Sequence, residues 1–449
     1  MTLRPSLLRD LLNPSLSVGG RAELCCELAR DFEKRGDYQE ACEALSTFWP
    51  RIGERPKLEG LEQRLAAEVL LRAGVLTGIV GSSRQIADAQ EIAKNLLTES
   101  LTIFQAQRLK NKAAEVQVEL ALCYWRTGDY HNAADLLNLA LEQLTTDSDV
   151  KAKAIIRVAI VDIDAGRLTE ALQYLSDNAA VFQKISNATL KGCYFQTLAD
   201  ALKDLWVSGA PGDYLDRALV EYAAASYHFE LADHRRYRAN VENNLGMIYF
   251  QISRCKEAHE HLDRARRIFA GLKDKGAMAQ VDENRARVLL KEKRYVEAEK
   301  VARASVRALE KIDTQLPLIE SLTTHGTALA RLGNYGAALT IFRRAIDGSQ
   351  QIGSLHHAGQ AALTVFQEMG EWLAVRDKGI VITGRSLSDE IQLLEHELIK
   401  HALETTSGSL TLASKNLGVS YQELDYMLKT RHSDLAYLRT PVRRRPRNK

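Results

Sequence analysis

The chain has 449 residues and a formal net charge of +2, with 45% hydrophobic and 26% charged residues. This balance is typical of a globular protein and excludes an intrinsically disordered chain. Because only 8 prolines occur, long helices are expected, and the length allows either several domains or one repeat array.

The N-terminal extension, residues 1–19, contains no signal-peptide core, because Arg4, Arg9 and Asp10 interrupt its apolar stretches. The most apolar run, residues 154–163, holds two charged residues and is far shorter than the roughly 20 residues that span a bilayer. The 6 cysteines are scattered without a C-x-x-C pair, which favours reduced thiols and no metal site. We therefore expect a soluble, cytoplasmic protein with no membrane partner and no cofactor.

Residues 20–354 contain a repeated pattern. An aromatic or apolar residue recurs at intervals of 38 to 48 residues, and an alanine stands three positions after each of them. The segments "RTGDYHNAADLLNLAL" and "RLGNYGAALTIFRRA" show the pattern clearly. The recurring residues, which we call the anchors, are Tyr38, Ile86, Tyr130, Leu168, Leu215, Cys255, Tyr295 and Tyr335.

Each repeat predicts a helical hairpin. The small alanine lets the second helix approach the first closely, and a glycine or polar residue before the anchor ends the first helix. One hairpin cannot bury its apolar face alone, so about eight hairpins should stack. Residues 355–385 then predict a capping helix and a linker, because a terminal repeat needs a polar outer face.

These hairpins resemble tetratricopeptide repeats. The resemblance implies a superhelix with a concave groove that binds a protein or a peptide. Asn243 and Asn244 are candidate groove contacts, since an amide can hold a peptide backbone through both its donor and its acceptor, although structural or exposed roles stay open for both. Trp125, Glu283 and Arg287 are further groove candidates.

Residues 386–438 predict a small domain of three helices. The first helix should bury one face, formed by Ile391, Leu394, Leu398 and Ala402. A short second helix covers about residues 410–417, and a third begins after Ser420. Two helices joined through Gly418 in this way are typical of a helix-turn-helix motif.

The stretch from Leu394 to Leu428 resembles the C-terminal domain of the Fis family of bacterial DNA-binding proteins. The match rests on Leu394-Glu395, Leu398-Ile399, Ala402-Leu403, Thr406, Gly408, Thr411, Ala413, Leu417-Gly418-Val419, Leu424 and Leu428. The resemblance implies that the third helix enters the major groove of DNA and that the protein binds as a homodimer. The DNA contacts it implies are Ser409, Thr411, Ser420, Tyr421, Gln422, Tyr426, Lys429 and Arg431.

The charges of the C-terminal region are unevenly distributed. Residues 386–438 hold four basic and eight acidic residues, whereas the tail, residues 439–449, holds six basic residues and no acid. We expect the tail to bind the DNA backbone through Arg443, Arg444, Arg445 and Arg447. The acidic third helix, with Asp425, leaves a second interpretation open, in which the three helices dock onto a protein.

The sequence therefore predicts an all-α protein: a tetratricopeptide-like superhelix followed by a small trihelical helix-turn-helix domain. The predicted function is a DNA-binding transcriptional regulator whose repeats bind a protein or peptide partner. The alternative is a non-enzymatic interaction scaffold. No phosphate-binding, dinucleotide-binding or nucleophile motif occurs in the sequence, so we do not expect an enzyme.

Overall fold

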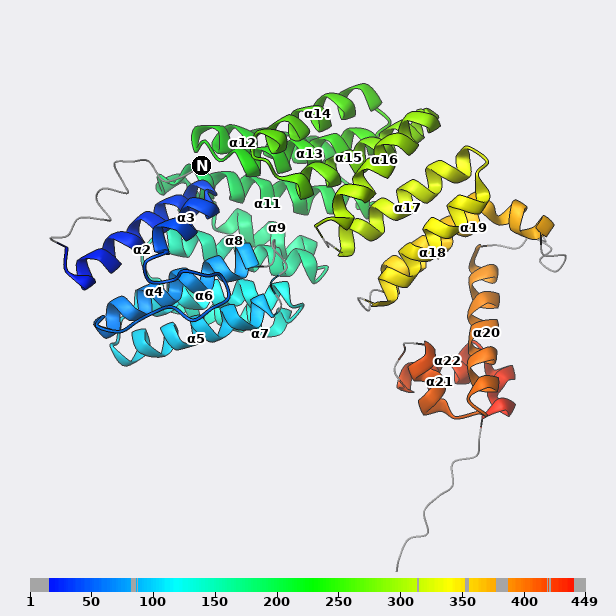
Figure 1. Cartoon of the computed structure of the whole chain (residues 1–449), viewed down its shortest axis with the longest axis horizontal. Coiled ribbons are helices and arrows are strands. Elements are labelled where there is room, and N and C mark those ends of the chain that lie inside the picture. Colours follow the sequence, from blue (N-terminus) through cyan, green and yellow to red (C-terminus); the bar gives the residue numbers. More distant parts are fainter. Residues whose placement is uncertain are drawn as a thin grey trace, which may run out of the picture. The chain divides into compact units, whose positions relative to one another are not determined.

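Figure 1 shows a computed structural model of the chain. The structure describes residues 16–81, 86, 88–312, 315–351, 355–376, 387–417, 419 and 421–439. Every regular element in these residues is a helix, which confirms the predicted all-α fold class. The chain divides into two compact units, Met1–Ser321 and Leu322–Lys449, and each is described by itself below.

The first unit consists of helical hairpins that stack in chain order. A short helix, α10 (Ala179–Lys184), separates the fourth hairpin from the fifth, and α4 runs on into a π-helical turn, Thr77–Gly81. The hairpins are α2 (Val18–Arg35) with α3 (Tyr38–Leu45), α4 (Gln63–Leu76) with α5 (Ala89–Ala106), α6 (Lys110–Arg126) with α7 (Tyr130–Gln143), α8 (Asp149–Asp164) with α9 (Leu168–Asp177), α11 (Ala188–Val207) with α12 (Tyr214–Leu231), α13 (Arg235–Gln251) with α14 (Cys255–Gly271), and α15 (Lys275–Lys291) with α16 (Tyr295–Glu310).

The anchors mark where the second helices start. Tyr38, Cys255 and Tyr295, for example, are each the first residue of a helix. The alanines three positions after the anchors are all buried, and the most exposed of them, Ala89, has 5% of its surface accessible. A larger side chain at these positions would have to push the two helices apart, so the predicted reason for the repeated alanine is confirmed.

Small residues on the first helices add to this close packing. A Cβ atom added to Gly246 of α13 would lie 2.7 Å from Leu262 Cγ of α14, and one added to Gly192 of α11 would lie 2.5 Å from the Phe229 ring of α12. Both distances are too short for a real contact. Glycine at these two positions is therefore required by the approach of the neighbouring helix and not by the backbone conformation.

The second unit begins within α17 (Gln315–Arg331) and continues with α18 (Tyr335–Gln351) and α19 (Leu355–Arg376). Phe342 of α18 and Met369 of α19 are almost completely buried in one apolar cluster. Arg331 Nε lies 2.5 Å from Glu368 Oε2 and links the end of α17 to α19. Helix α18 starts at the last anchor, Tyr335, and therefore follows the same pattern as the hairpins of the first unit.

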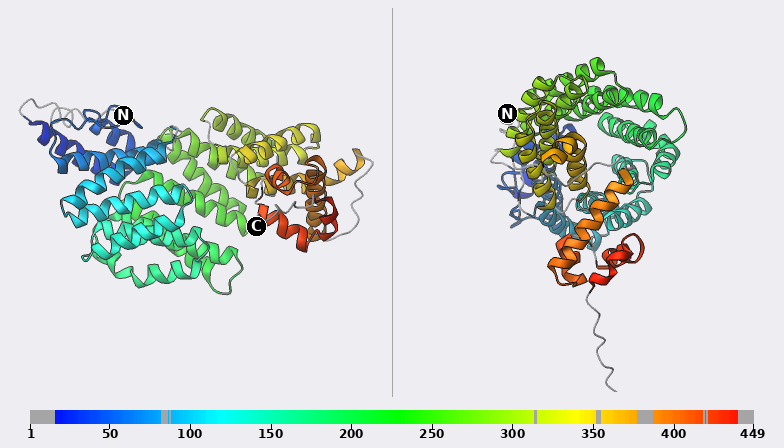
Figure 2. Two further views of the ribbon diagram at one scale, coloured as in Figure 1. Left: turned by 90° about the horizontal axis from the view of Figure 1, so that it is seen from below. Right: turned by 90° about the vertical axis from the view of Figure 1, so that its right-hand side faces the viewer.

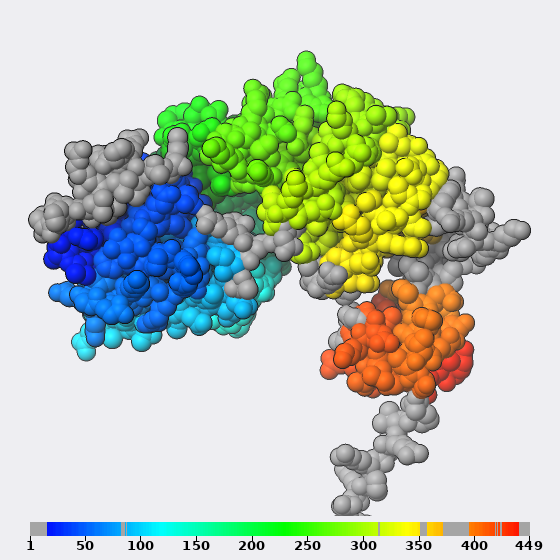
Figure 3. Space-filling model, viewed as in Figure 1, coloured from blue at the N-terminus to red at the C-terminus, as the bar shows by residue number. Residues whose placement is uncertain are grey.

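The C-terminal part of the second unit contains α20 (Leu387–Thr405), α21 (Leu410–Leu417), α22 (Tyr421–Thr430) and a short 3-10 helix, Ser433–Leu438. These elements, orange to red in Figure 3, share one apolar core. The prediction that Leu398 faces this core is wrong, because 51% of its surface is exposed. Ala402 is buried as predicted, and Ile399 and Leu403 join it in the core. The side chains of Ile391 and Leu394 lie outside the described residues.

Candidate functional site

The first unit encloses a cavity of about 400 Å³. The first helices of six consecutive hairpins line it: α2, α4, α6, α8, α11 and α13. The end-on view in Figure 2 shows these hairpins winding around a common centre. Apolar side chains such as Val75, Ile79, Val118 and Ile156 alternate in the lining with charged ones. An enclosed space with both kinds of lining is typical of a ligand site.

The cavity is bounded on one side by a contact between hairpins that are far apart in the sequence. Thr189 Oγ1 of α11 donates a hydrogen bond of 3.1 Å to the backbone oxygen of Lys34 at the end of α2. A Cβ atom on Gly36 would lie 2.6 Å from the ring of His234, and Gly36 has a φ of +76°. We call this contact the seam, defined by Lys34, Gly36, Thr189 and His234.

Three ionisable side chains lie in or beside the seam: His234, Tyr38 and Tyr237. Burial lowers the pKa of His234 to about 4, and its Nδ1 accepts a hydrogen bond of 3.3 Å from the backbone nitrogen of Tyr237. The hydroxyl groups of Tyr38 and Tyr237 form a hydrogen bond, and burial raises the pKa of Tyr38. His234 is therefore neutral at physiological pH, and the seam is held by uncharged groups.

Arg72 of α4 lies at one end of the cavity with only 3% of its side chain exposed. Its Nη1 is 2.6 Å from Glu33 Oε2 and its Nη2 is 2.5 Å from Glu115 Oε1. Burial lowers the pKa of Arg72, but the charges of Glu33, Glu115 and Glu68 outweigh that effect and raise it above its ordinary value. Burial likewise raises the pKa of Glu115, yet Arg72 and Lys112 bring it down to about 2.

Glu119 of α6 carries a second charged group in the cavity. Its carboxylate lies 2.8 Å from Lys153 Nζ and 2.7 Å from Arg157 Nη2, both of α8. Burial raises the pKa of Glu119, but the charges of Arg157 and Lys153 outweigh this and lower it below its usual range. Glu119 is therefore ionised and shares its single charge between two cations.

The sequence prediction missed these cavity residues, although the sequence contains a signal for them. Glu33 and Arg72 are 39 residues apart, and Arg72 and Glu115 are 43 apart. Both separations fall within the range of the repeat spacing, so the three charges lie on successive first helices, although at different positions relative to their anchors. Opposite charges about one repeat apart are therefore only a partial signal for these residues.

None of the five predicted groove residues lines the cavity. Glu283 is buried with 7% of its surface exposed, and the guanidinium of Arg287 lies 5.5 Å from the centre of the Phe250 ring. The other three form hydrogen bonds to a neighbouring repeat: Trp125 to Asp164 at 2.6 Å, Asn243 to Asn284 at 2.9 Å, and Asn244 to Asp200 at 3.4 Å. These bonds tie successive repeats together.

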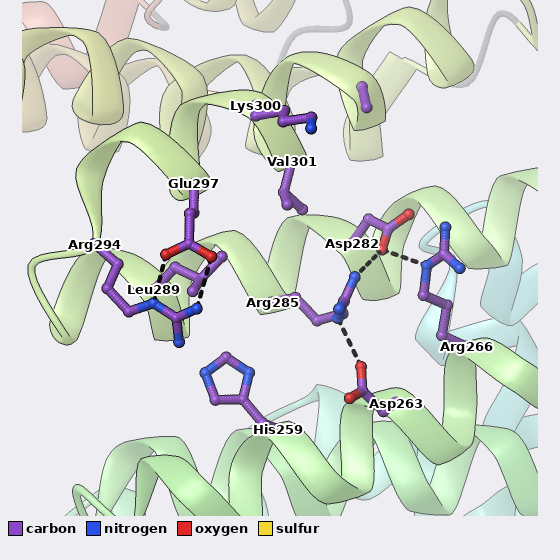
Figure 4. A pocket seen from close by; sticks show the side chains of 11 residues that line it. His259, Asp263, Arg266, Asp282, Arg285, Leu289, Arg294, Glu297, Lys300 and Val301 are labelled. Carbon is purple, nitrogen blue, oxygen red and sulfur yellow. Dashed lines mark hydrogen bonds and ion pairs between the residues drawn. The ribbon is translucent and has the colours of Figure 1, made fainter.

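A second hollow, of about 550 Å³, lies among α14, α15 and α16 (Figure 4). Its charged side chains pair with one another. Arg285 lies 3.0 Å from Asp263 and 2.9 Å from Asp282, and Arg294 lies 2.6 Å from Glu297. This hollow therefore has fewer charged side chains without an oppositely charged partner than the cavity lined by α2, α4, α6, α8, α11 and α13.

The described residues offer little for metal or thiol chemistry. Among them, no three His, Cys, Asp or Glu side chains gather as a metal ion would require. All six cysteines are free thiols, and burial raises the pKa of Cys25 to about 11 and of Cys193 to about 12. In the same part of the chain no helix is long and apolar enough to cross a membrane.

Helix α22 presents four of the predicted DNA contacts to solvent. Gln422, Tyr426 and Lys429 share one face of the helix, and Tyr426 has 63% of its surface exposed. Tyr421 is 45% exposed and the side chain of Arg431 is 47% exposed. Before α21, Ser409 is half-buried, and Thr411 within it is exposed. The remaining predicted contacts lie outside the described residues: Ser420, Arg443, Arg444, Arg445 and Arg447.

Basic side chains pair with the acidic residues near α22. Asp425 Oδ2 lies 2.5 Å from Lys429 Nζ, and its Oδ1 lies 2.8 Å from Arg439 Nη2. Hydrogen bonding to Lys429 lowers the pKa of Asp425, so it stays ionised. Glu395 lies 3.3 Å from Arg431 Nη1. Asp425, one of the two acidic residues of this helix, is therefore matched by two cations, and Arg439, the first residue of the basic tail, lies beside α22.

Two segments of the chain match family models of the tetratricopeptide repeat, residues 82–148 and residues 277–351. Together with the stacked hairpins, these matches establish that the chain contains tetratricopeptide repeats. No curated protein matches the chain in sequence.

Several solved structures are similar to the chain at low sequence identity. The apo form of the quorum sensor NprR from B. thuringiensis has a TM-score of 0.51 at 11% identity, and the match covers 76% of this chain and 91% of that one. A Rap protein complexed with Competence and Sporulation Factor has a TM-score of 0.49 at 14% identity, over 78% of this chain and 97% of that one. NprR in complex with its cognate peptide NprX has a TM-score of 0.46 at 13% identity, over 82% and 99%. The likeness to apo NprR supports the fold alone.

Proposed function

We propose that the protein is a DNA-binding transcriptional regulator. Its repeats bind a peptide or protein partner in the cavity, and α21 and α22 act as a Fis-like helix-turn-helix that binds DNA together with the basic tail. Partner binding changes how the two C-terminal domains of a homodimer are presented to DNA. The observation that carries the proposal is the exposed face of Gln422, Tyr426 and Lys429 on a helix whose other side packs into an apolar core.

The chemistry of this face suits the major groove. A glutamine side chain can form two hydrogen bonds to adenine, and a lysine can bind guanine or a phosphate. Asp425 would repel phosphate if its charge were free, but Lys429 and Arg439 neutralise it. Arg439, the first residue of the basic tail, donates a hydrogen bond to Asp425 of α22.

The partner-binding part of the proposal rests on the cavity. Its lining combines apolar side chains with hydrogen-bonding groups such as Asn187, Gln196 and Asn240. A peptide needs both, because its side chains are partly apolar and its backbone carries donors and acceptors at every residue. NprR, which is named as a quorum sensor, has a similar fold. This likeness supports a role for the repeats in detecting a signal.

The test is capture of fragmented genomic DNA from the organism of origin by the purified full-length protein, followed by sequencing. Wild type should enrich a defined site, and Tyr426→Ala should lose most of that enrichment. Tyr437→Ala is the matched control, since Tyr437 is 75% exposed but lies on the 3-10 helix and not on α22. Equal enrichment by both variants would contradict the assignment of α22 as the reading helix.

A second candidate function is a protein-interaction scaffold whose C-terminal helices dock onto another protein. The observation in its favour is a set of exposed apolar and aromatic side chains, Leu398, Leu412, Tyr426 and Tyr437, each with more than half of its surface accessible. If wild type enriches no DNA even at low salt, where phosphate contacts are strongest, the scaffold becomes the better interpretation.

A further inference from the structure

The charged residues that line the cavity are not fully matched. Six of them are basic: Arg30, Lys34, Arg72, Arg126, Lys153 and Arg157. Four are acidic: Glu33, Glu115, Glu119 and Asp149. With His234 neutral, the lining has an excess of two positive charges.

Arg30 and Lys34 pair with Glu68 and Asp31, which lie outside the lining. The cations that lack a carboxylate of their own are therefore on α6 and α8. Lys153 and Arg157 share the one carboxylate of Glu119. Arg126, on the next turns of α6, has no carboxylate within salt-bridge distance among the residues that the structure describes. Around Arg72, by contrast, Arg30 and Lys112 also pair with the carboxylates, so three cations meet Glu33, Glu68 and Glu115. The two groups of charges therefore differ in their balance.

The position of Arg126 is fixed by an unusual piece of backbone. Its Nη1 donates a hydrogen bond of 2.6 Å to the backbone oxygen of Gly78, which lies in the π-helical turn that ends α4. A π-helical turn frees carbonyl groups from the regular helical pattern, and such turns occur often at functional sites. Gln90 Nε2 also donates to Gly78 at 2.8 Å. One side of the Arg126 guanidinium is thus held, while the rest stays accessible to solvent.

The environment of Arg126 disfavours its positive charge. Desolvation by the surrounding protein lowers its pKa, and the nearby charge of Arg157 lowers it further. An arginine held in this way beside another cation, with no carboxylate nearby, leaves N–H donors open to a bound anion. The planar guanidinium fork matches a carboxylate or a phosphate, which can accept two parallel hydrogen bonds from it.

We propose that Arg126, with Arg157 and Lys153 beside it, forms a subsite that binds an oxyanion group of the ligand that fills the cavity. The inference rests on the proposed partner-binding function and specifies the chemistry of that partner. The oxyanion is supplied by a carboxylate of a peptide or by a phosphate. Glu33, whose Oε1 is buried without a hydrogen-bond partner at the other end, offers an acceptor for an N–H group of the same ligand.

The test uses the immobilised full-length chain and a mixture of random pentapeptides, prepared once with free C-terminal carboxylates and once as C-terminal amides. Retention is measured by mass spectrometry, and binding of inorganic phosphate is measured separately by calorimetry. Wild type should retain the free-acid mixture about tenfold more than the amide mixture, since a charged hydrogen bond is lost in the amide. Phosphate should compete with the free-acid form.

Three variants locate the effect. Arg126→Gln should remove the preference for the free acid, and Arg126→Lys should restore part of it because the charge returns. Arg217→Gln is the control, since Arg217 is exposed on α12 and does not line the cavity. Circular dichroism establishes that each variant is folded. A preference that persists in Arg126→Gln overturns the proposal.

The outcomes separate this inference from the proposed function. Equal retention of acids and amides, with no phosphate binding, overturns the oxyanion subsite but leaves peptide binding in the cavity standing. Binding of phosphate that depends on Arg126, without a preference for the peptide acids, supports the subsite and identifies phosphate as the source of the oxyanion. Retention of neither mixture, with no phosphate binding, overturns both.

Discussion

Replacement of Arg72 by methionine should destabilise the repeat array strongly. Arg72 is 3% exposed and is the cation shared by Glu33 and Glu115, which lie 2.6 and 2.5 Å from it. Methionine fills similar space but leaves Glu33 without its counter-charge and Glu115 with Lys112 alone. Removal of one partner from a buried ion pair costs about 3–5 kcal/mol. Arg55→Met is the matched control, because the Arg55–Glu99 pair is on the surface and contributes about 0–1 kcal/mol.

The assay is urea unfolding of the full-length protein, followed by far-ultraviolet circular dichroism. The midpoint should fall much further for Arg72→Met than for Arg55→Met, and the second substitution Glu115→Gln should recover part of the loss. The pKa of Glu115 is lowered to about 2 in the folded protein. Its contribution to stability is therefore present above its unfolded pKa and lost as pH falls toward 2. Arg72→Met should weaken that dependence, because Lys112 remains beside Glu115. Equal midpoints for the two variants would refute the reasoning.

Three other predictions concern packing, pH and DNA. Gly246→Ala should lower the free energy of unfolding by about 1–3 kcal/mol, because the added methyl group would collide with Leu262. Gly359→Ala should raise the free energy of unfolding by about 0.5–1 kcal/mol, because the added methyl group meets no atom within 4 Å. Urea midpoints that move in the same direction for both variants would contradict this reasoning. The pKa of His234 is about 4 in the folded protein, so the unfolded chain binds a proton at this residue first as pH decreases. The free energy of unfolding should therefore fall by up to about 3 kcal/mol between the unfolded pKa of His and pH 4, and thermal melts of His234→Asn should lack this fall. Lys429→Ala should reduce the slope of DNA affinity against salt by about 1 in fluorescence anisotropy titrations, and an unchanged slope would exclude a phosphate contact at that residue.

The sequence was sufficient to predict the repeats because their signal is local. An anchor such as Tyr295 and the alanine after it define a hairpin within a few residues, and that pattern recurs along the chain. The cavity was not predictable in the same way. In the sequence, Arg72 and Glu115 are ordinary charges on amphipathic helices, and only the winding of the hairpins encloses them.

A similar limit applies to the C-terminal helices. The periodicity of α20 accommodates either Leu398 or Ile399 on the core side, because the two residues differ by only one position on the helix. The choice depends on how α20 packs against Leu424 and Leu435, which are distant in sequence. The ion pair between Asp425 and Arg439 could not be predicted from the sequence either, since the two residues are 14 positions apart.

The seam gives the first hairpins a folding behaviour that an open array lacks. In an open array each repeat touches only its neighbours, so the ends can fray while the middle persists. Here Lys34 and Thr189 are joined across 155 residues, and loss of the first hairpin also removes a contact from α11 and α13. The helices between them should therefore unfold as one cooperative block. The same long-range closure raises the contact order of the block, so it should form more slowly than the hairpins that follow it.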